Sequence, residues 1–475
     1  MPPDQSEIDT CLRVLEQAAA ADPAEPRWQA VREAAARLYR SDKKRRKAAR
    51  RAERALRDRA AVATAQRFRD QDPSPAAPGD SPPPVVRREL CNSRRCYICK
   101  ERYREVRSDY HMLCERCAEE NLARRNARCD LRGRIAVVTG GRVKIGFHVA
   151  LKLLRDGARV LVTTRFPRDA ARRFAEVPDS ADWRDRLHVH GVDFLDLPAV
   201  AGLIDEVHRR FDHLDILINN AAQTIRRPPA YYREVRAAES APLTGAAAGI
   251  DVRDARPALA GPAPRPTAAP PAALPGPETG TAGPDPAGVP ALEALAEALF
   301  PAGRTDETGQ PLDLRARNSW SLRAHEVEPL EWMETHVVNA FVPFLLTARL
   351  RGLLEASPFP DRYIVQVSAM EGSFSRHAKT VRHPHTNMAK ASLNMLTRTA
   401  AADYAASGIH MNSVDTGWIT DERPHPDKTA QREAGFRPPL DVIDGAARVY
   451  DPIVRGVQGH PVSGLFLKDY RAVEW

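Results

Sequence analysis

From Leu131 to the end of the chain, short apolar runs alternate with longer segments of helical periodicity. The apolar runs have the length of buried strands; they are RIAVVTG, ARVLVTT, LHVHGVD, LDILINN, RYIVQVSA, IHMNSV and the short GLFLK. The segments expected to be helical are FHVALKLLRDG and residues near 168–176, 198–211, 330–354, 386–406 and 440–450. Strands separated by helices indicate βαβ units. The pattern therefore predicts an α/β domain over 131–475, built on a doubly wound parallel sheet.

The alternation stops after Ala222. Residues 256–290 are dominated by Pro, Ala and Gly without hydrophobic periodicity, so they have no means of forming a packed core. We predict a largely disordered insertion at about 228–315. Residues 312–332 hold two tryptophans and mixed charge, and we expect that part to be ordered near the cleft.

Residues 1–70 have helical composition with a break at Asp22-Pro23, and a proline-rich linker is predicted over 71–87. Residues 43–57 carry nine basic side chains and one acidic side chain. A helix charged on nearly all sides is typical of a solvated or partner-binding element. Nucleic acid is the alternative partner.

The amino-acid composition gives the chain a net positive charge. The 475 residues carry a formal net charge of +9, which favours anions such as nucleotides, phosphorylated substrates or nucleic acid, although a general Arg, Ala and Pro bias explains it equally well. No apolar run approaches the roughly 18–20 residues that span a bilayer, and the start Met1-Pro2-Pro3-Asp4 lacks a signal-peptide pattern. We expect a soluble cytoplasmic protein with no membrane partner.

Five of the seven cysteines lie between Cys91 and Cys117. Four of them form a C-x2-C-x14-C-x2-C pattern, and these are Cys96, Cys99, Cys114 and Cys117. Four thiolates satisfy tetrahedral zinc with no open position, so a structural zinc module is predicted over 88–128, with Cys91 and His111 as substitute ligands. The module is basic with interleaved aromatics, which suits nucleic acid, protein docking or domain stabilisation alike.

A glycine-rich turn follows the first predicted strand of the large domain. Thr139, Gly140, Arg142, Lys144, Ile145 and Gly146 belong to this turn, which opens a helix. Such a turn presents backbone N–H groups and a helix N-terminus to a pyrophosphate.

Further motifs recur in a defined order along the chain. They are Asp193 after the third strand, Asn219-Asn220-Ala221-Ala222 after the fourth, Asn339 in the next helix, Lys390, and Asn412 to Thr420 with Thr416-Gly417. With the TGxxxGIG-like turn, this set resembles the short-chain dehydrogenase/reductase (SDR) family. The resemblance covers 131–475 apart from the insertion. It implies a Rossmann-type fold, hydride transfer between NAD(P) and a carbonyl or alcohol small-molecule substrate, and a homo-oligomer.

The resemblance also implies the cofactor-binding residues. They are Thr139, Gly140, Arg142, Lys144, Ile145, Gly146, Arg165, Asp193, Asn220, Ala221, Lys390, Thr416 and Gly417. Arg165 stands at the end of the second strand, where NAD-preferring relatives carry an acid. With Arg142 and Lys144 it predicts that NADP(H) is preferred over NAD(H), unless Arg165 is a surface charge.

The catalytic positions depart from the family pattern. Thr386 stands where the family has its tyrosine, four residues before Lys390, and Ala369 stands at the serine position. We predict catalytic roles for Lys390, Asn339 and Thr386, with His385 as the first candidate for a substitute acid and His383 as the second. The cations of the 369–386 segment favour an anionic substrate. The alternative is a non-catalytic dinucleotide-binding scaffold whose zinc module and basic helix bind a protein or nucleic acid.

Overall fold

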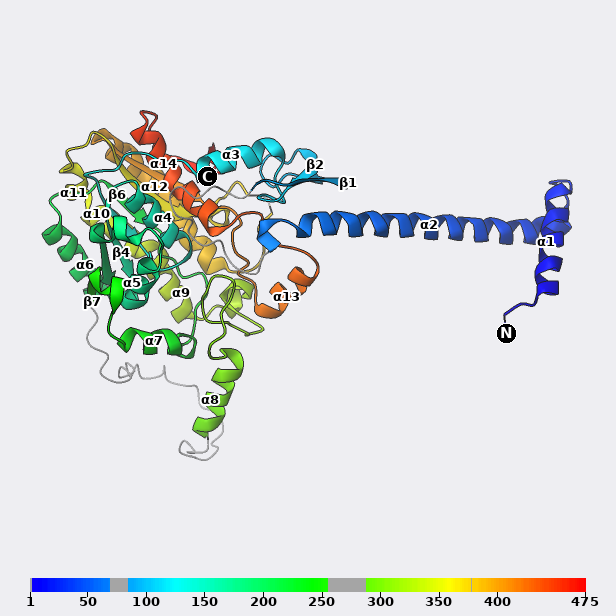
Figure 1. Cartoon of the computed structure of the whole chain (residues 1–475), viewed down its shortest axis with the longest axis horizontal. Coiled ribbons are helices and arrows are strands. Elements are labelled where there is room, and N and C mark those ends of the chain that lie inside the picture. The colour runs from blue at the N-terminus through cyan, green and yellow to red at the C-terminus, as the bar shows by residue number, and fades with distance from the viewer. Residues whose placement is uncertain (1, 69–83, 255–287, 377) are drawn as a thin grey trace.

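The computed structural model describes residues 2–68, 84–254, 288–376 and 378–475. A mixed α/β body holds most of these residues, and one long helix projects from it (Figure 1). None of the helices in the described parts combines the length and the apolar character that a bilayer span requires.

A nine-stranded sheet forms the centre of the body, as the alternating pattern predicts. The strands are β3 (Ile135–Thr139), β4 (Arg159–Thr164), β5 (Leu187–Gly191), β6 (Ile216–Asn219), β7 (Asp251–Asp254), β8 (Arg362–Ser368), β9 (Ile409–Asp415), β10 (Phe466–Lys468) and β11 (Arg471–Val473). Their order is β11-β10-β9-β8-β6-β3-β4-β5-β7. All neighbours pair in parallel except β10 and β11. The strands of the middle of the sheet are buried on both faces, which explains their continuous Val, Ile and Leu runs.

Helices cover both faces of the sheet. One face packs against α4 (Lys144–Arg155), α5 (Pro167–Ala175) and α14 (Val442–Val457). The other face packs against α6 (Leu197–Arg210), α10 (Val342–Arg349), α11 (Arg351–Glu355) and α12 (Pro384–Ala406). The helix expected near 330–354 is divided into α9 (Pro329–His336), a π turn (Val337–Phe341), α10 and α11.

The chain leaves β3 toward β4 and β5 on one side, and continues from β6 through β8, β9 and β10 on the other. Connections on the two sides of β3 and β6 therefore run apart at the carboxyl ends of these strands. Crevices at such switch points are where open α/β sheets bind ligands.

The predicted insertion is largely ordered where the structure describes it, so the expectation of disorder over 228–315 is wrong for much of that range. A 3-10 turn (Pro229–Tyr232), α7 (Arg233–Ser240) and β7 follow one another, and β7 pairs with β5 at the edge of the sheet. Beyond α8 (Gly288–Leu299), residues 300–315 fold back on the body, where Leu312 is buried. The predicted disorder of 256–290 falls mainly on 255–287, which lie outside the described residues.

The N-terminal region consists of α1 (Gln5–Ala20) and the long α2 (Gln29–Ala63). The break falls at Asp22-Pro23, where the Arg32 guanidinium donates to the carbonyl oxygens of Ala18, Ala21, Asp22 and Pro23. Helix α2 extends away from the body and carries α1 at its far end (Figure 1). Most of the predicted linker lies outside the described residues.

The cysteine-rich segment forms a small unit at the base of α2. It contains the antiparallel pair β1 (Arg87–Arg95) and β2 (Arg102–Arg107), followed by α3 (Glu115–Arg125). The Asp58 carboxylate of α2 accepts hydrogen bonds from the main-chain N–H groups of Cys91 and Asn92. Helix α3 packs against α14, so this unit joins α2 to the α/β body. Helix α13 (His425–Glu433) of the large domain was not expected from the sequence.

Candidate dinucleotide site

A cavity of about 1190 Å³ opens at the carboxyl ends of the central strands. Its wall contains the glycine-rich turn, the ends of β4, β5, β8 and β9, and the start of α12. Of the predicted cofactor residues, twelve line it: Gly140, Arg142, Lys144, Ile145, Gly146, Arg165, Asp193, Asn220, Ala221, Lys390, Thr416 and Gly417. The structure therefore brings residues from all parts of the large domain into one concave site.

Two of the three glycines of the turn, Gly140 and Gly146, are required by close backbone contacts. Gly140 has φ +69°, and a Cβ there would lie 2.9 Å from the Cα of Ala221. A Cβ on Gly146 would lie 2.3 Å from the carbonyl oxygen of Gly140. Because no side chain fits at either position, this tight turn needs glycine at both, as do the turns that bring backbone N–H groups close to a phosphate.

The turn is held in place by the strand beside it. The Thr139 hydroxyl accepts hydrogen bonds from the main-chain N–H groups of Asn220 and Ala221, both at 2.9 Å. The Asn220 side-chain amide donates to the carbonyl oxygens of Thr139 and Gly140 at 3.0 and 3.1 Å. Thr139 and Asn220 thus serve mainly to fix the turn, which makes their role at the site one of positioning.

Lys144 occupies the position of the missing glycine in a left-handed conformation, with φ +54°. That region is sterically costly for a residue with a side chain. Its ammonium lies 3.5 Å from a carboxylate oxygen of Glu422. Burial opposes the charge of Lys144, but the carboxylates of Glu422, Asp306 and Glu307 together outweigh it and raise the pKa of the lysine. Lys144 therefore reaches the cavity as one half of an ion pair.

One end of the cavity is built around Arg165 at the end of β4. The Arg165 guanidinium donates to the Tyr232 hydroxyl at 2.8 Å, and its central carbon lies 4.7 Å from the centre of the Tyr232 ring. Asp193 lines the same end. Arg142, by contrast, forms an ion pair with Asp169 at 2.6 Å. Tyr232 belongs to the segment expected to be disordered, so sequence reasoning missed it.

Lys390 and Thr386 face the cavity from the first turns of α12. The Lys390 ammonium donates to the Val367 carbonyl oxygen at 2.7 Å, and burial lowers its pKa to about 8. Thr386 is buried, and among the described residues its hydroxyl oxygen has no hydrogen-bond partner. The Ser368 hydroxyl turns instead to Asn394 of α12, to which it donates at 2.6 Å.

His385 does not face this cavity, and the expectation that it is the first candidate acid is wrong. Its Nε2 lies 3.5 Å from a Glu331 carboxylate oxygen, and it lines a separate hollow of about 400 Å³ with Trp332 and Met388. The reason is helical geometry, because His385 and Thr386 are neighbours and point about 100° apart around α12.

His383, the second candidate, lines the main cavity. It has φ +43° at the residue before α12, and its ring stacks on Trp320 with centroids 3.8 Å apart. Its Nδ1 lies 2.9 Å from the Asn387 side-chain oxygen, and burial lowers the pKa of the imidazole. Trp320 also lines the cavity, in agreement with the expected order of 312–332.

Asn339 is buried and forms hydrogen bonds with the loop after β6. Its side-chain oxygen accepts from the Gln223 N–H at 2.6 Å, and its amide donates to the Gln223 carbonyl oxygen at 3.1 Å. It lies in the π turn between α9 and α10. The structure therefore gives it a positioning contact with a residue of the cavity wall.

The far end of the cavity holds a cluster that sequence reasoning missed. The Asp415 carboxylate accepts from the main-chain N–H groups of Met370 and Gly417 at 2.6 and 2.7 Å, and forms an ion pair with Lys468 at 3.2 Å. Asp415 thus ties together the ends of three neighbouring strands. Lys468 lies in the short GLFLK strand, where only strand pairing could have placed it at the site.

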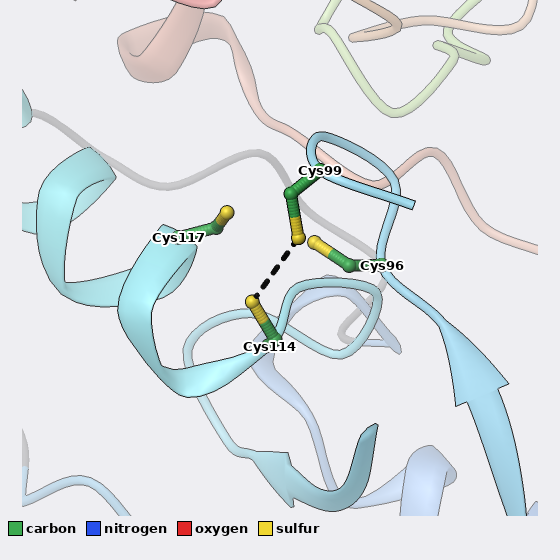
Figure 2. A group of neighbouring side chains, drawn as sticks. All are labelled: Cys96, Cys99, Cys114 and Cys117. Carbon is green, nitrogen blue, oxygen red and sulfur yellow. Dashed lines mark hydrogen bonds between the residues drawn. The ribbon is translucent and has the colours of Figure 1, made fainter. Parts of the chain in front are cut away.

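The four predicted metal ligands converge in the cysteine-rich unit. Their sulfur atoms all lie within 4.8 Å of one another, and Figure 2 shows them directed toward one point from the turn after β1 and from the start of α3. Cys99 and Cys114 sulfurs are 3.6 Å apart. Tetrahedral zinc with Zn–S bonds of about 2.3 Å places its sulfurs roughly 3.8 Å apart, so the group fits zinc. Cys91 and His111, the substitute ligands, lie outside this group.

Known proteins match the two halves of the large domain. A short chain dehydrogenase family model matches residues 134–240, and an enoyl-(acyl carrier protein) reductase family model matches 316–434. An uncharacterized protein of Acanthamoeba polyphaga mimivirus is 33% identical over 378 residues, which cover 76% of this chain and 71% of that one. The (+)-neomenthol dehydrogenase of Capsicum annuum is 32% identical over 90 residues, or 18% of this chain and 28% of the enzyme.

Solved structures match about 70% of the chain at low identity. A dehydrogenase/reductase from Sinorhizobium meliloti is 19% identical with a TM-score of 0.43, covering 71% of this chain and 94% of the other. A short-chain dehydrogenase from Streptomyces avermitilis is 15% identical with a TM-score of 0.41, covering 70% and 88%.

The sheet, its switch-point cavity and the glycine turn define a Rossmann-type α/β protein. With the two family matches, they show that the chain belongs to the short-chain dehydrogenase/reductase family. Its large domain has the fold of an SDR-type oxidoreductase.

Proposed function

We propose that the protein is an NADP(H)-dependent oxidoreductase that interconverts a carbonyl compound and its alcohol with an altered proton donor. The observation that carries this is the position of Lys390, whose ammonium is held at the cavity wall by Val367 in the domain that bears the glycine turn. When bound, the nicotinamide supplies or accepts the hydride. Lys390 is suited to hold the ribose and to favour negative charge on the substrate oxygen.

The choice of NADP(H) rests on Arg165. Two of the three cations that suggest it, Arg142 and Lys144, already face carboxylates, and this reduces the positive potential that each offers to a phosphate. Arg165 lines the cavity beside Asp193, and its hydrogen bond to the Tyr232 hydroxyl fixes the guanidinium at the cavity wall. A 2′-phosphate beside Arg165 supports charge-assisted hydrogen bonding.

The proposed proton donor is His383. Because its Nδ1 faces the Asn387 oxygen, Nδ1 carries a hydrogen and Nε2 is the nitrogen that gains or loses a proton. In reduction, hydride adds to the carbonyl carbon and the proton of His383 Nε2 goes to the oxygen. In oxidation, neutral Nε2 takes the hydroxyl proton. The hydroxyl of Thr386 is a hydrogen-bond donor for the substrate and not an acid.

An anionic substrate remains part of the proposal. Arg376 forms an ion pair with Glu371 at 2.6 Å, but the Lys379 ammonium donates to main-chain carbonyl oxygens of Met370 and Glu371. Lys379 thus contributes a positive charge at the cavity mouth, where a carboxylate or phosphate of the substrate would be attracted.

The direct test is NADPH oxidation over a panel of carbonyl compounds, including carboxylate-bearing ones. Lys390→Ala should abolish the turnover found with the wild type. Full activity in Lys390→Ala would overturn the catalytic role. Absence of turnover with tight NADPH binding would favour the alternative of a dinucleotide-binding scaffold.

The second candidate function is polyanion binding by α2. It is favoured by the spacing of basic residues along this helix. Lys43 and Lys47, Arg46 and Arg50, and Arg50 and Arg54 are pairs four residues apart, an arrangement that destabilises a helix. Of the acids nearby, Asp42 pairs with Arg45 and Arg46, and Glu53 pairs with Arg57. Phosphates along α2 would relieve the remaining repulsion.

Titration of full-length protein with a duplex of random sequence tests this. The expected result is salt-dependent binding that weakens strongly when Lys43, Lys44, Arg45, Arg46 and Lys47 are changed together to Gln. Unchanged binding in that variant would remove α2 as the site.

A further inference from the structure

The cysteine-rich unit enters the dinucleotide cavity. Tyr97 and Lys100, which lie in and beside the first cysteine turn, are part of the cavity wall together with Lys390 and Gly417. Both precede the large domain in sequence. A closed four-thiolate site needs no such contact for its own stability, so the position of Tyr97 calls for a separate explanation.

Tyr97 is fixed at both of its ends. Its main-chain N–H donates to the Met112 carbonyl oxygen at 2.8 Å, inside the cysteine-rich unit. Its phenol oxygen accepts the main-chain N–H of Trp418 at 3.0 Å. Trp418 follows Thr416-Gly417 in the loop after β9, so one side chain joins the cysteine turn to a loop of the site.

Apolar packing reinforces this connection. Ile419, Leu440 and Val442 of the large domain share one buried cluster with residues of the cysteine-rich unit: Leu90, Cys96, Tyr103, Val106, Tyr110, Leu113, Cys117 and Ala118. Gly417, with φ +82°, has no room for a side chain, since an added Cβ would lie 2.6 Å from a Leu440 methyl group. The loop after β9 is therefore clamped between the unit and the cavity.

The contact lies at the end of the cavity away from Arg165. The Lys468 ammonium is 5.8 Å from the centre of the Tyr97 ring and pairs with Asp415. Asp415 and Lys468 belong to β9 and β10. Arg165 and Asp193 instead follow β4 and β5, on the other side of β3. Tyr97 thus stands at the end where the nicotinamide and substrate would meet.

We propose that the cysteine-rich unit is part of the ligand site, with Tyr97 as a positioning residue that holds residues 416–422 in their binding conformation. Metal binding by the four cysteines and ligand binding in the cavity are then thermodynamically linked, because each favours the same ordered loop. Linkage is reciprocal. The factor by which bound metal raises the affinity for NADPH must therefore equal the factor by which bound NADPH raises the affinity for the metal. This inference rests on the proposed dinucleotide binding.

The first experiment measures zinc transfer from the full-length protein to a chromophoric chelator, with and without saturating NADPH. We expect NADPH to strengthen zinc retention by about fivefold or more, in the range of ordinary coupling between sites. Tyr97→Phe removes only the acceptor for the Trp418 N–H and should abolish most of this effect. Tyr103→Phe is the matched control, because its hydroxyl donates to the His111 carbonyl oxygen inside the unit.

The second experiment needs no cofactor. Amide hydrogen exchange over 416–422 should become faster when zinc is removed and in Tyr97→Phe, and should stay at the wild-type rate in Tyr103→Phe. Equal exchange in the two variants, or equal zinc retention with and without bound NADPH, would overturn the inference. If the wild type binds no NADPH, the proposed function fails, and the exchange rates alone decide the role of Tyr97.

Discussion

The buried charge of Lys390 should lower the stability of the folded protein. It is buried, and its pKa of about 8 lies below the ordinary 10.5 of lysine. The folded state therefore binds this proton less tightly than the unfolded state. At any pH below about 8 the lysine is charged in both states, and the burial of that charge opposes folding in full.

Replacing Lys390 by methionine should therefore stabilise the fold while abolishing turnover. We expect the free energy of unfolding at pH 7 to rise by about 1–3 kcal/mol, after allowing for the lost hydrogen bond to Val367. The difference from wild type should shrink between pH 8 and 10.5, as the lysine loses its proton in the folded state. Urea denaturation at several pH values measures this, and a destabilised variant at pH 7 would contradict it.

Because His383 is the proposed proton donor, we expect opposite pH dependences for the rates of reduction and oxidation. Burial lowers the pKa of His383 below its ordinary 6.5. Reduction needs the protonated ring, so its rate should rise as the pH falls toward this lowered pKa. Oxidation needs the neutral ring, and its rate should be lost over the same interval.

His383→Gln should cut turnover about 10²-fold or more and remove this pH dependence. His385→Gln is the matched variant, because His385 lies outside the cavity beside Glu331. A larger loss in His385→Gln than in His383→Gln would reverse the assignment.

Among the elements, the turn between β3 and α4 shows how far the sequence determines the site. Gly146→Ala would place a Cβ 2.3 Å from the Gly140 carbonyl oxygen, so we expect cofactor affinity to fall at least tenfold. Gly202→Ala in α6 is the control, since an added Cβ there meets nothing within 4 Å. That variant should keep the affinity and unfold no more easily than wild type.

The cysteine-rich unit should hold one metal ion. Elemental analysis of the purified protein should give about one zinc per chain, and Cys114→Ser should lower both zinc content and stability. Equal stability with and without metal would show that the four sulfurs converge for another reason.

Elements with a strong pattern were predictable from the sequence, and the others were not. The strands of the large domain carry continuous apolar runs, and the two C-x2-C pairs have a spacing that only a shared metal explains well. By contrast, β7 (Asp251–Asp254) has no apolar signal, because it is an edge strand whose side chains are mostly exposed. Proline-rich neighbours concealed the ordered residues around Tyr232 as well.

Contacts between distant segments account for the rest of the site. The sequence placed Lys390 and Thr386 correctly on one helix, but it did not show that His385 faces away from the cavity while His383, just before that helix, faces it. Nothing local in the sequence indicated that Tyr97 would meet Trp418, or that Asp415 would join Lys468. Such pairings follow from strand order and from how the cysteine-rich unit packs, and neither is encoded in a short motif.

The whole molecule consists of three parts that follow one another along the chain: the long basic helix, the cysteine-rich unit and the α/β body. Asp58 ties α2 to the cysteine-rich unit, and Tyr97 ties that unit to the cavity. The proposed oxidoreductase site is thus assembled from more of the chain than the family domain alone.

Calorimetric titration of the full-length protein with NADPH and with NADH is the decisive measurement of the proposed cofactor site. We expect one cofactor per chain, with NADPH bound at least tenfold more tightly than NADH, and a preference lost or reversed in Arg165→Asp. Binding of neither cofactor by the zinc-loaded wild type would rule out the proposed function, and equal affinity for both would rule out the role given to Arg165.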